Sequence, residues 1–230
     1  MNQNPIPIIA IDGTSSSGKG TIASLLAKHL GFHYLNSGAL YRLSAHLGVI
    51  NNIDLSDHSE ENLNKIVDLI LTESKNVDFI DKQVIYNGHD IWPLLASQEA
   101  GNNAALISFY PPLRYAIRDF QRGRIKTPGL VAEGRDMGTA VFPDAIAKLY
   151  LDASVEARAH RRLKDEEKRN SGKTYEMLCE ELRKRDETDK GHAVGALKLA
   201  EDALYIDTSD LTIEEVLEKC IAWCEEKGVE

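Results

Sequence analysis

A segment rich in glycine and serine, Gly13–Thr21, limits most strongly what this chain can fold into. Its residues are Gly13, Thr14, Ser15, Ser16, Ser17, Gly18, Lys19, Gly20 and Thr21. The apolar run Ile6–Ile11 before it predicts a buried parallel strand, and the periodic run Ile22–Leu30 after it predicts a helix. Glycines at this spacing let backbone N–H groups approach phosphate oxygens, while a lysine reaches the terminal phosphates. We therefore expect a phosphate-binding loop at a helix N-terminus, with a nucleoside triphosphate as its ligand.

The alternative interpretation of this segment is a turn that merely joins a strand to a helix. Gly20 stands where Ser or Thr usually binds magnesium, and the hydroxyl follows one residue later at Thr21. This Gly-Lys-Gly-Thr ending resembles the nucleoside monophosphate kinases. In that family phosphates and water hold most of the metal's coordination sites, so the resemblance implies no direct protein ligand for Mg2+, with Thr21 as the one candidate.

Length and composition favour one α/β domain with insertions. The chain has 230 residues, and its formal net charge of −9 disfavours nonspecific binding to nucleic acid or an anionic membrane. Residues 1–7 lack the features of a signal peptide, and no stretch approaches the roughly 20 apolar residues that span a bilayer. Cys179, Cys220 and Cys224 are predicted to be core thiols rather than disulfide or zinc ligands. We expect a cytoplasmic protein.

A second anion-binding group is predicted after a short second strand, Phe32–Leu35. This strand ends at Asn36-Ser37-Gly38, and helical spacing then places Arg42 one turn into a new helix. Because ligands of doubly wound sheets bind at the carboxyl ends of the strands, Ser37 and Arg42 are expected near the phosphate loop. The alternative is a solvated arginine on a surface helix.

The stretch from Asp54 to about Ser108 interrupts the α/β alternation and is predicted to be an insertion. It contains an acidic helix around Glu60–Ser74 and a hairpin, Val77–Ile80 with Val84–Tyr86. Asn87-Gly88 predicts a turn, and Trp92, Leu94 and Leu95 are expected to cover a small satellite core.

A basic helix and a third strand follow the insertion. Pro111-Pro112 precedes that helix, in which Arg114, Arg118 and Arg122 share one face, and we expect one of them to contact a ligand. The strand Leu130–Glu133 is followed by a charged loop, Gly134–Thr139, whose Arg135-Asp136 pair could bind phosphate and accept hydrogen bonds. The alternative is a self-contained Arg135–Asp136 surface pair.

The C-terminal part contains two further strands, Ala147–Leu151 and Ala203–Ile206, separated by the charged stretch Glu156–Lys190. A long solvated helix is the simplest interpretation of that stretch, but the break at Asn170–Lys173 favours two helices with a mobile tip, as in a lid. The last helix is predicted to start at Thr212 with a capping box to Glu215. Its apolar stripe is Ile213, Val216, Leu217, Cys220, Ile221 and Cys224.

Four segments in this order resemble the bacterial cytidylate kinases. They are Gly13–Thr21, Asn36–Arg42, Glu133–Thr139 and Arg185–Asp189. The resemblance implies a P-loop NTPase-type α/β fold of three layers, with a five-stranded parallel sheet. It also implies transfer of the γ-phosphoryl group of ATP to CMP or dCMP, in pyrimidine nucleotide metabolism, by a monomer that requires Mg2+.

The same resemblance suggests one P-loop kinase domain over residues 1–230. Its core would comprise residues 1–38, 109–154 and 190–230, with a monophosphate-binding insertion at about 39–108 and a lid at about 155–189. Lys19 and the loop amides would hold ATP, and the lid arginines Arg158 and Arg162 would close over it. Catalysis would thus rest on Lys19, Arg135, Arg158 and Arg162.

The acceptor side, carried over by position, is a set of polar residues from several elements. It comprises Ser37, Arg42, Arg114, Arg135, Asp136, Arg185 and Asp189. In this assignment Arg42 and Arg135 hold the CMP phosphate with Ser37 beside them. Arg114 and Asp136 read the cytosine edge, and Arg185 and Asp189 contact ribose or phosphate.

Two departures from the family pattern concern the acceptor. His192 stands where the family usually has arginine, and a neutral histidine cannot form the arginine's forked contact. The family pattern leads us to expect an arginine at Ala96-Ser97 and a base-contacting serine at Ala104-Ala105. Preference for cytosine would then depend more on Arg114 and Asp136.

Three other functions remain compatible with parts of the sequence. A kinase for UMP, AMP or a sugar acid would share the loop and the lid. A nucleotide switch would usually carry an Asn-Lys-x-Asp segment, but Asn64–Val67 lacks the aspartate. A nucleic-acid-binding protein could use Glu156–Lys190, although that stretch lacks interleaved aromatic residues.

Overall fold

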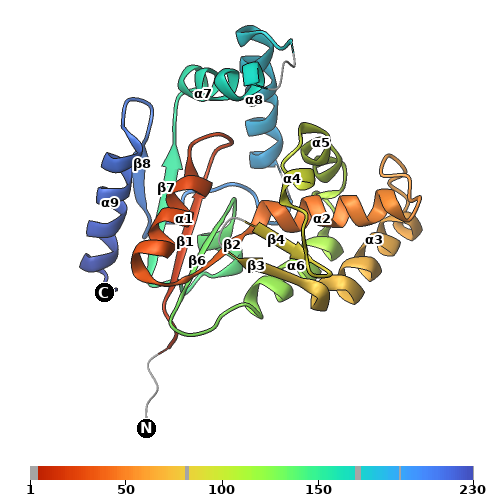
Figure 1. The fold of residues 1–230 in the computed structure, drawn as a ribbon, viewed down its shortest axis with the longest axis horizontal. Coiled ribbons are helices and arrows are strands. Elements are labelled where there is room, and N and C mark those ends of the chain that lie inside the picture. Colours follow the sequence, from red (N-terminus) through yellow and green to blue (C-terminus); the bar gives the residue numbers. More distant parts are fainter. Residues whose placement is uncertain (1–4, 81–82, 169–171, 192, 230) are drawn as a thin grey trace.

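Five parallel strands form the central sheet of this computed structural model, which describes residues 5–80, 83–168, 172–191 and 193–229 (Figure 1). Their order is β2–β6–β1–β7–β8. The strands are β1 (Ile8–Gly13), β2 (His33–Asn36), β6 (Leu130–Gly134), β7 (Ala147–Asp152) and β8 (Leu204–Asp207). Every strand predicted for the sheet is therefore present, and all five carboxyl ends lie at one edge.

The first strand begins and ends later than predicted. Pro7 precedes it, and proline has no N–H to donate to a ladder. At the other end, Gly13 still pairs with Leu151 of β7. A Cβ on Gly13 would lie 2.0 Å from the Leu151 carbonyl oxygen, and its φ of +153° also favours glycine. This close approach lets β1 run directly into the phosphate loop.

Helices cover both faces of the sheet, which gives three layers (Figure 1). On one face, Ile9 and Ile11 pack with α1 (Lys19–Leu30) and α9 (Ile213–Glu226). On the other, Ala10 packs with α2 (Ser37–Ile50) and α6 (Pro111–Arg122). Alternate residues of one strand thus enter two separate cores, and burial of this apolar surface stabilises the layers.

Between β2 and β6 the chain forms helices and a small antiparallel sheet of order β3–β4–β5. These elements are α3 (Glu60–Glu73), β3 (Val77–Ile80), β4 (Gln83–Tyr86), β5 (His89–Asp90), α4 (Trp92–Leu95) and α5 (Gln98–Ile107). The predicted pairing of β3 with β4 is confirmed, with Phe79 opposite Val84. The predicted turn at Asn87-Gly88 is also confirmed, since both residues have positive φ.

The predicted satellite core is wrong. Leu95 is fully buried, but it belongs to the large cluster that includes Leu43 of α2 and Ile117 of α6. Leu94 is 53% exposed. The insertion therefore shares the core on one face of the main sheet.

Two helices follow β7, as the break in the charged stretch predicted. They are α7 (Val155–Lys168) and α8 (Tyr175–Gly191), and they lie beyond the end of the sheet (Figure 1). Their contact forms a small core of Ala159, Leu178, Cys179 and Leu182. The first two residues of the predicted break, 170 and 171, lie outside the described residues.

The last helix has the predicted capping box between Thr212 and Glu215. Cys220 and Cys224 are fully buried, as expected of core thiols, but Ile213 is 50% exposed and does not belong to the buried stripe. In the described ranges, every helix falls short of the length and apolar character needed to cross a membrane.

Candidate active site

A cavity of about 530 Å³ opens at the carboxyl ends of the sheet strands. It lies between the phosphate loop, the start of α2, the loop after β6, α5 and the helices α7 and α8. Predicted site residues that line it are Ser15, Lys19, Ser37, Arg42, Arg114, Arg135, Asp136, Arg162, Arg185 and Asp189. Segments far apart in the sequence thus bring all seven predicted acceptor residues together with the lysine of the loop. The remaining loop residues and Arg158 are not part of the lining.

The phosphate loop connects β1 to α1 through residues of unusual backbone conformation. Ser16 and Gly18 have φ of 63° and 91°. The ammonium group of Lys19 donates to the carbonyl oxygen of Thr14 over 3.1 Å. Burial, with a further contribution from nearby Arg135, lowers the pKa of Lys19 to about 8. The lysine is thus held over its own loop, where a phosphate would favour its charged form.

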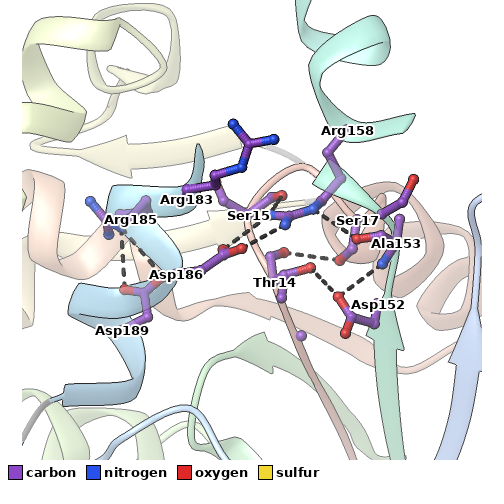
Figure 2. A network of polar contacts seen from close by, with 12 residues as sticks. Thr14, Ser15, Ser17, Asp152, Ala153, Arg158, Arg183, Arg185, Asp186 and Asp189 are labelled. Atoms are coloured by element: carbon purple, nitrogen blue, oxygen red, sulfur yellow. Dashed lines mark hydrogen bonds and ion pairs between the residues drawn. The ribbon is translucent and has the colours of Figure 1, made fainter. Parts of the chain in front are cut away.

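Figure 2 shows how the loop is tied to the strands and helices around it. Thr14 donates its hydroxyl proton to Asp152 at the end of β7, with an oxygen–oxygen distance of 2.7 Å. The guanidinium of Arg158, on α7, donates to the Ser15 carbonyl oxygen over 3.2 Å. It also forms a double ion pair with Asp186 of α8, at 3.0 and 2.6 Å. Arg158 therefore connects the loop to both helices of the predicted lid.

Arg135 and Asp189 form the centre of the cavity's charged wall. Nη2 of Arg135 lies 2.9 Å from the Asp189 carboxylate, and Nη1 donates to the Gly13 carbonyl oxygen over 2.5 Å. Arg185 contacts the other oxygen of Asp189 at 3.2 Å. Burial lowers the pKa of Arg135, and the charge of Asp189 opposes that shift. Two arginines therefore face the cavity around one buried carboxylate.

Asp136 pairs with Arg114 of α6, not with its neighbour Arg135. Nη2 of Arg114 lies 3.0 Å from the Asp136 carboxylate, and both side chains are at least nine-tenths buried. Arg114 also donates to the carbonyl oxygens of Ser108 and Gly195, each over 2.9 Å. Burial raises the pKa of Asp136, while Arg114 opposes the shift. The alternative of a self-contained Arg135–Asp136 surface pair is therefore wrong, because each residue has another partner.

Asp12, which the sequence did not single out, fixes the loop after β6. Its two carboxylate oxygens accept the backbone N–H groups of Met137 and Gly138 over 2.7 and 2.8 Å. Burial raises the pKa of Asp12 to about 7, against the effect of those two donors. The signal that could have identified Asp12 is that it is a charged residue in an otherwise apolar strand. Asp186 and Asp152 were also missed, because their partners are distant in sequence.

The remaining predicted residues, two on the acceptor side and one in the lid, contact the insertion or α6. Arg42 donates to the carbonyl oxygens of Leu95 and Ser97 over 2.6 and 2.7 Å, where α4 meets α5. The Ser37 hydroxyl accepts a hydrogen bond from Gln121 over 2.8 Å. Arg162 donates to the side-chain oxygen of Gln98 on α5. The lid and the insertion thus meet across the cavity.

The departures from the family pattern fall partly on the cavity wall. Ala104 and Ala105 line it, together with Asn102 and Ser108. Ser97 caps α5 by accepting the Ala100 N–H. His192 lies outside the described residues. Among the residues that are described, no group of three or more His, Cys, Asp or Glu side chains is arranged to hold a metal ion.

The sequence comparisons agree on one family. A family model described as cytidylate kinase matches residues 9–226. A cytidylate kinase from Burkholderia thailandensis is 44% identical, over 98% of this chain and 96% of that protein. One from Aeromonas salmonicida is 42% identical, over 96% and 95%. Among solved structures, a shikimate kinase from Bacteroides thetaiotaomicron covers 95% of this chain and 98% of its own, with 15% identity and a TM-score of 0.43.

Proposed function

The chain belongs to the cytidylate kinase family, whose members transfer the γ-phosphoryl group of ATP to CMP or dCMP, and we propose that the cavity described above performs this reaction. The observation that carries the proposal is the convergence, at one edge of the sheet, of a phosphate loop and an arginine-rich wall on the same cavity. Such an arrangement can hold two phosphorylated ligands with their phosphates facing each other.

On the donor side, the loop Gly13–Gly18 and the N-terminus of α1 bind the phosphates of ATP. Backbone N–H groups supply the donors, and Lys19 supplies a cation. The lysine's bond to the Thr14 carbonyl oxygen is exchanged for phosphate oxygens when ATP arrives. A triphosphate raises the pKa of Lys19 again, so binding and protonation reinforce each other.

On the acceptor side, Arg42 and Arg135 hold the phosphate of CMP, with Ser37 at the N-terminus of α2 beside it. Arg185 and Asp189 contact the ribose or phosphate. Arginine suits this task because its planar fork binds two oxygens of one phosphate. The ion pairs with Asp189 keep the arginines in position before the ligand binds.

Arg114 and Asp136 read the cytosine edge. The exocyclic amino group of cytosine is a hydrogen-bond donor, whereas the corresponding uracil oxygen is an acceptor. A carboxylate accepts but cannot donate, so Asp136 favours cytosine. Asn102 and Ser108, which line the same cavity, stand close to the place of the missing serine at Ala105 and are proposed as further polar contacts.

Catalysis depends on positioning and on stabilising charge, since phosphoryl transfer requires little covalent chemistry from the protein. Lys19, Arg135, Arg158 and Arg162 are proposed to neutralise the charge that shifts from donor to acceptor. Closure of α7 and α8 over the cavity excludes the water that would otherwise accept the phosphoryl group. In the present structure Arg158 is satisfied by Asp186, and it can exchange that partner for phosphate.

Mg2+ is proposed as the second cofactor, held by nucleotide oxygens and water, with the Thr21 hydroxyl as the one nearby protein candidate. The residues present fit this arrangement, because the first turn of α1 offers a hydroxyl beside Lys19. The ion supplies charge neutralisation at the phosphates when it is bound.

Further proposals concern the organisation of the chain. Residues 1–38, 109–154 and 190–230 form the kinase core, about 39–108 the monophosphate-binding insertion and about 155–189 the lid. We also propose a cytoplasmic monomer with neither nucleic-acid nor membrane partners, consistent with the acidic net charge of −9.

The test is ADP production from ATP and Mg2+ by the purified protein, with CMP, dCMP, UMP, AMP, GMP and shikimate as acceptors. We expect strong preference for CMP and dCMP. Equal or better use of UMP would show that the base pocket has changed. If no acceptor increased turnover, the kinase assignment itself would be wrong, and a nucleotide switch would be the better hypothesis.

A further inference from the structure

We propose that Gln121 is a positioning residue that directs the hydroxyl proton of Ser37 toward the acceptor's phosphate. The proposal rests on the proposed function. Gln121 lies on α6 and is 1% exposed, and it is not among the residues that line the cavity. Its side-chain Nε2 donates to Oγ of Ser37 over 2.8 Å. Gln121 therefore supports the cavity wall from behind and does not touch the ligand.

The direction of this hydrogen bond decides what Ser37 can do. A serine hydroxyl has one proton to donate and lone pairs that accept. Because the Gln121 amide occupies a lone pair, the hydroxyl proton must be directed elsewhere. Within the described part of the chain, the Ser37 hydroxyl makes no donor bond, and Ser37 lines the cavity. The proton is thus available to an acceptor oxygen of a ligand.

The surroundings of Ser37 indicate that this oxygen belongs to the phosphate. Ser37 is the first residue of α2, whose N-terminus favours negative charge. A Cβ on Gly134 would lie 3.1 Å from the Cβ of Ser37, so this glycine lets the end of β6 approach the helix closely. The next residue, Arg135, brings its cation to the same wall of the cavity.

Helix α6 supports two parts of the acceptor side. Arg114 and Gln121 are seven residues apart, which places them on one face of the helix. Both are buried, and each reaches a cavity-lining residue: Arg114 contacts Asp136, and Gln121 contacts Ser37. Leu113 and Ile117 anchor the helix in the core. The helix thus holds a base-reading carboxylate and a phosphate-binding hydroxyl at a fixed separation.

The experiment compares steady-state constants for CMP and for ATP in the full-length protein. The variants are Gln121→Met, Gln121→Glu, Ser37→Ala and the double variant Ser37→Ala/Gln121→Met. Ser44→Ala is the matched control, because Ser44 is a buried serine on the same helix whose hydroxyl bonds back to the Leu40 carbonyl oxygen. Wild-type turnover of CMP tests the proposed function separately, before any variant is compared.

We expect Gln121→Met to raise KM for CMP about three- to tenfold, the effect of one neutral hydrogen bond, with KM for ATP unchanged. The double variant should be no worse than Ser37→Ala, since Gln121 acts only through Ser37. Ser44→Ala should match wild type. Additive losses in the double variant, or equal increases in both KM values, would show a merely structural role and overturn the proposal.

Gln121→Glu supplies a second readout that does not depend on deleting the side chain. An ionised carboxylate would accept the Ser37 proton and reverse the hydrogen bond, whereas a protonated one would donate as glutamine does. The ratio of variant to wild-type KM for CMP should therefore fall as the pH is lowered. A ratio that does not change with pH would contradict the proposed direction of the hydrogen bond from Gln121 to Ser37. Thermal melts identify any variant whose fold is lost.

Discussion

Arg158 of α7 and Asp186 of α8 form a double ion pair, with Nη1–Oδ1 and Nη2–Oδ2 distances of 3.0 and 2.6 Å. The same guanidinium reaches the phosphate loop through the Ser15 carbonyl oxygen. If Arg158 contacts phosphate as proposed above, its guanidinium must be held in place before ATP arrives. Asp186 holds the guanidinium of Arg158 in place, and a phosphate would replace Asp186 as its partner.

The first prediction concerns stability. Asp186→Ala leaves the guanidinium of Arg158 buried without its anionic partner, and we expect a loss of about 3 kcal/mol in the free energy of unfolding. Glu156→Ala is the control, since Glu156 pairs with Arg183 between the same two helices at an exposed site. That variant should lose less than about 1 kcal/mol. Urea denaturation measures both, and equal losses would contradict the burial argument.

The second prediction concerns the lysine of the phosphate loop. Lys19→Ala should lower kcat by about 100-fold or more, because it removes a cation aimed at the transferred phosphates. The fold should remain intact, since within the described residues the hydrogen bond of Lys19 is to the nearby Thr14 carbonyl oxygen. Turnover of CMP measures the loss of activity, and a thermal melt checks that the fold is intact. Activity near wild type would reject the central role of the loop.

Local patterns predicted the elements of the fold well. The five sheet strands follow from short apolar runs bounded by glycine, proline or polar residues, and the capping box at Thr212 is a purely local signal. Errors arose where burial depends on distant partners. Leu94 and Leu95 are equally apolar, yet only Leu95 faces the core, because the direction of the very short helix α4 decides it.

The site was predictable in its members but not in its connections. Motifs named Arg135, Asp136 and Asp189, yet no local rule indicated that Arg135 pairs with Asp189 while Asp136 pairs with Arg114. Those pairings depend on how β6, α6 and α8 are placed relative to one another. Asp12 and Gln121 were missed for the same reason, since each acts on a residue more than 80 positions away.

The third prediction follows from the lowered pKa of Lys19. Its pKa of about 8 in the ligand-free protein means that the charge is lost as the pH rises through that value. ATP then binds only with uptake of a proton, so KM for ATP should increase above pH 8, by up to about tenfold per pH unit. Lys19→Arg keeps its charge and should give a flatter profile, whatever its absolute activity. If KM for ATP rose equally with pH in the wild type and in Lys19→Arg, Lys19 would not be the group whose loss of charge weakens ATP binding.

The fourth prediction concerns Arg135 and the acceptor phosphate. Arg135→Ala removes a charge-assisted contact worth about 1.5–3 kcal/mol, so kcat/KM for CMP should fall by roughly 10- to 150-fold. Arg135→Lys should recover little of this loss, because an ammonium group cannot contact both Asp189 and a phosphate as the planar fork does. Full recovery with lysine would show that charge alone matters there.

The last prediction concerns the choice of base. Asp136→Asn turns an acceptor-only group into one that can also donate, and uracil offers an acceptor oxygen where cytosine offers an amino group. The ratio of kcat/KM for CMP to that for UMP should therefore fall at least about tenfold.

The control for this prediction is Asp186→Asn, measured with the same two acceptors. Asp186 contacts Arg158 on the donor side, so its loss should lower turnover of CMP and UMP alike and leave the ratio unchanged. An equal loss with both acceptors in Asp136→Asn would mean that Asp136 only supports Arg114 and does not read the base. A changed ratio in Asp186→Asn would instead show that the lid contributes to acceptor choice, because closure would then differ between the two nucleotides.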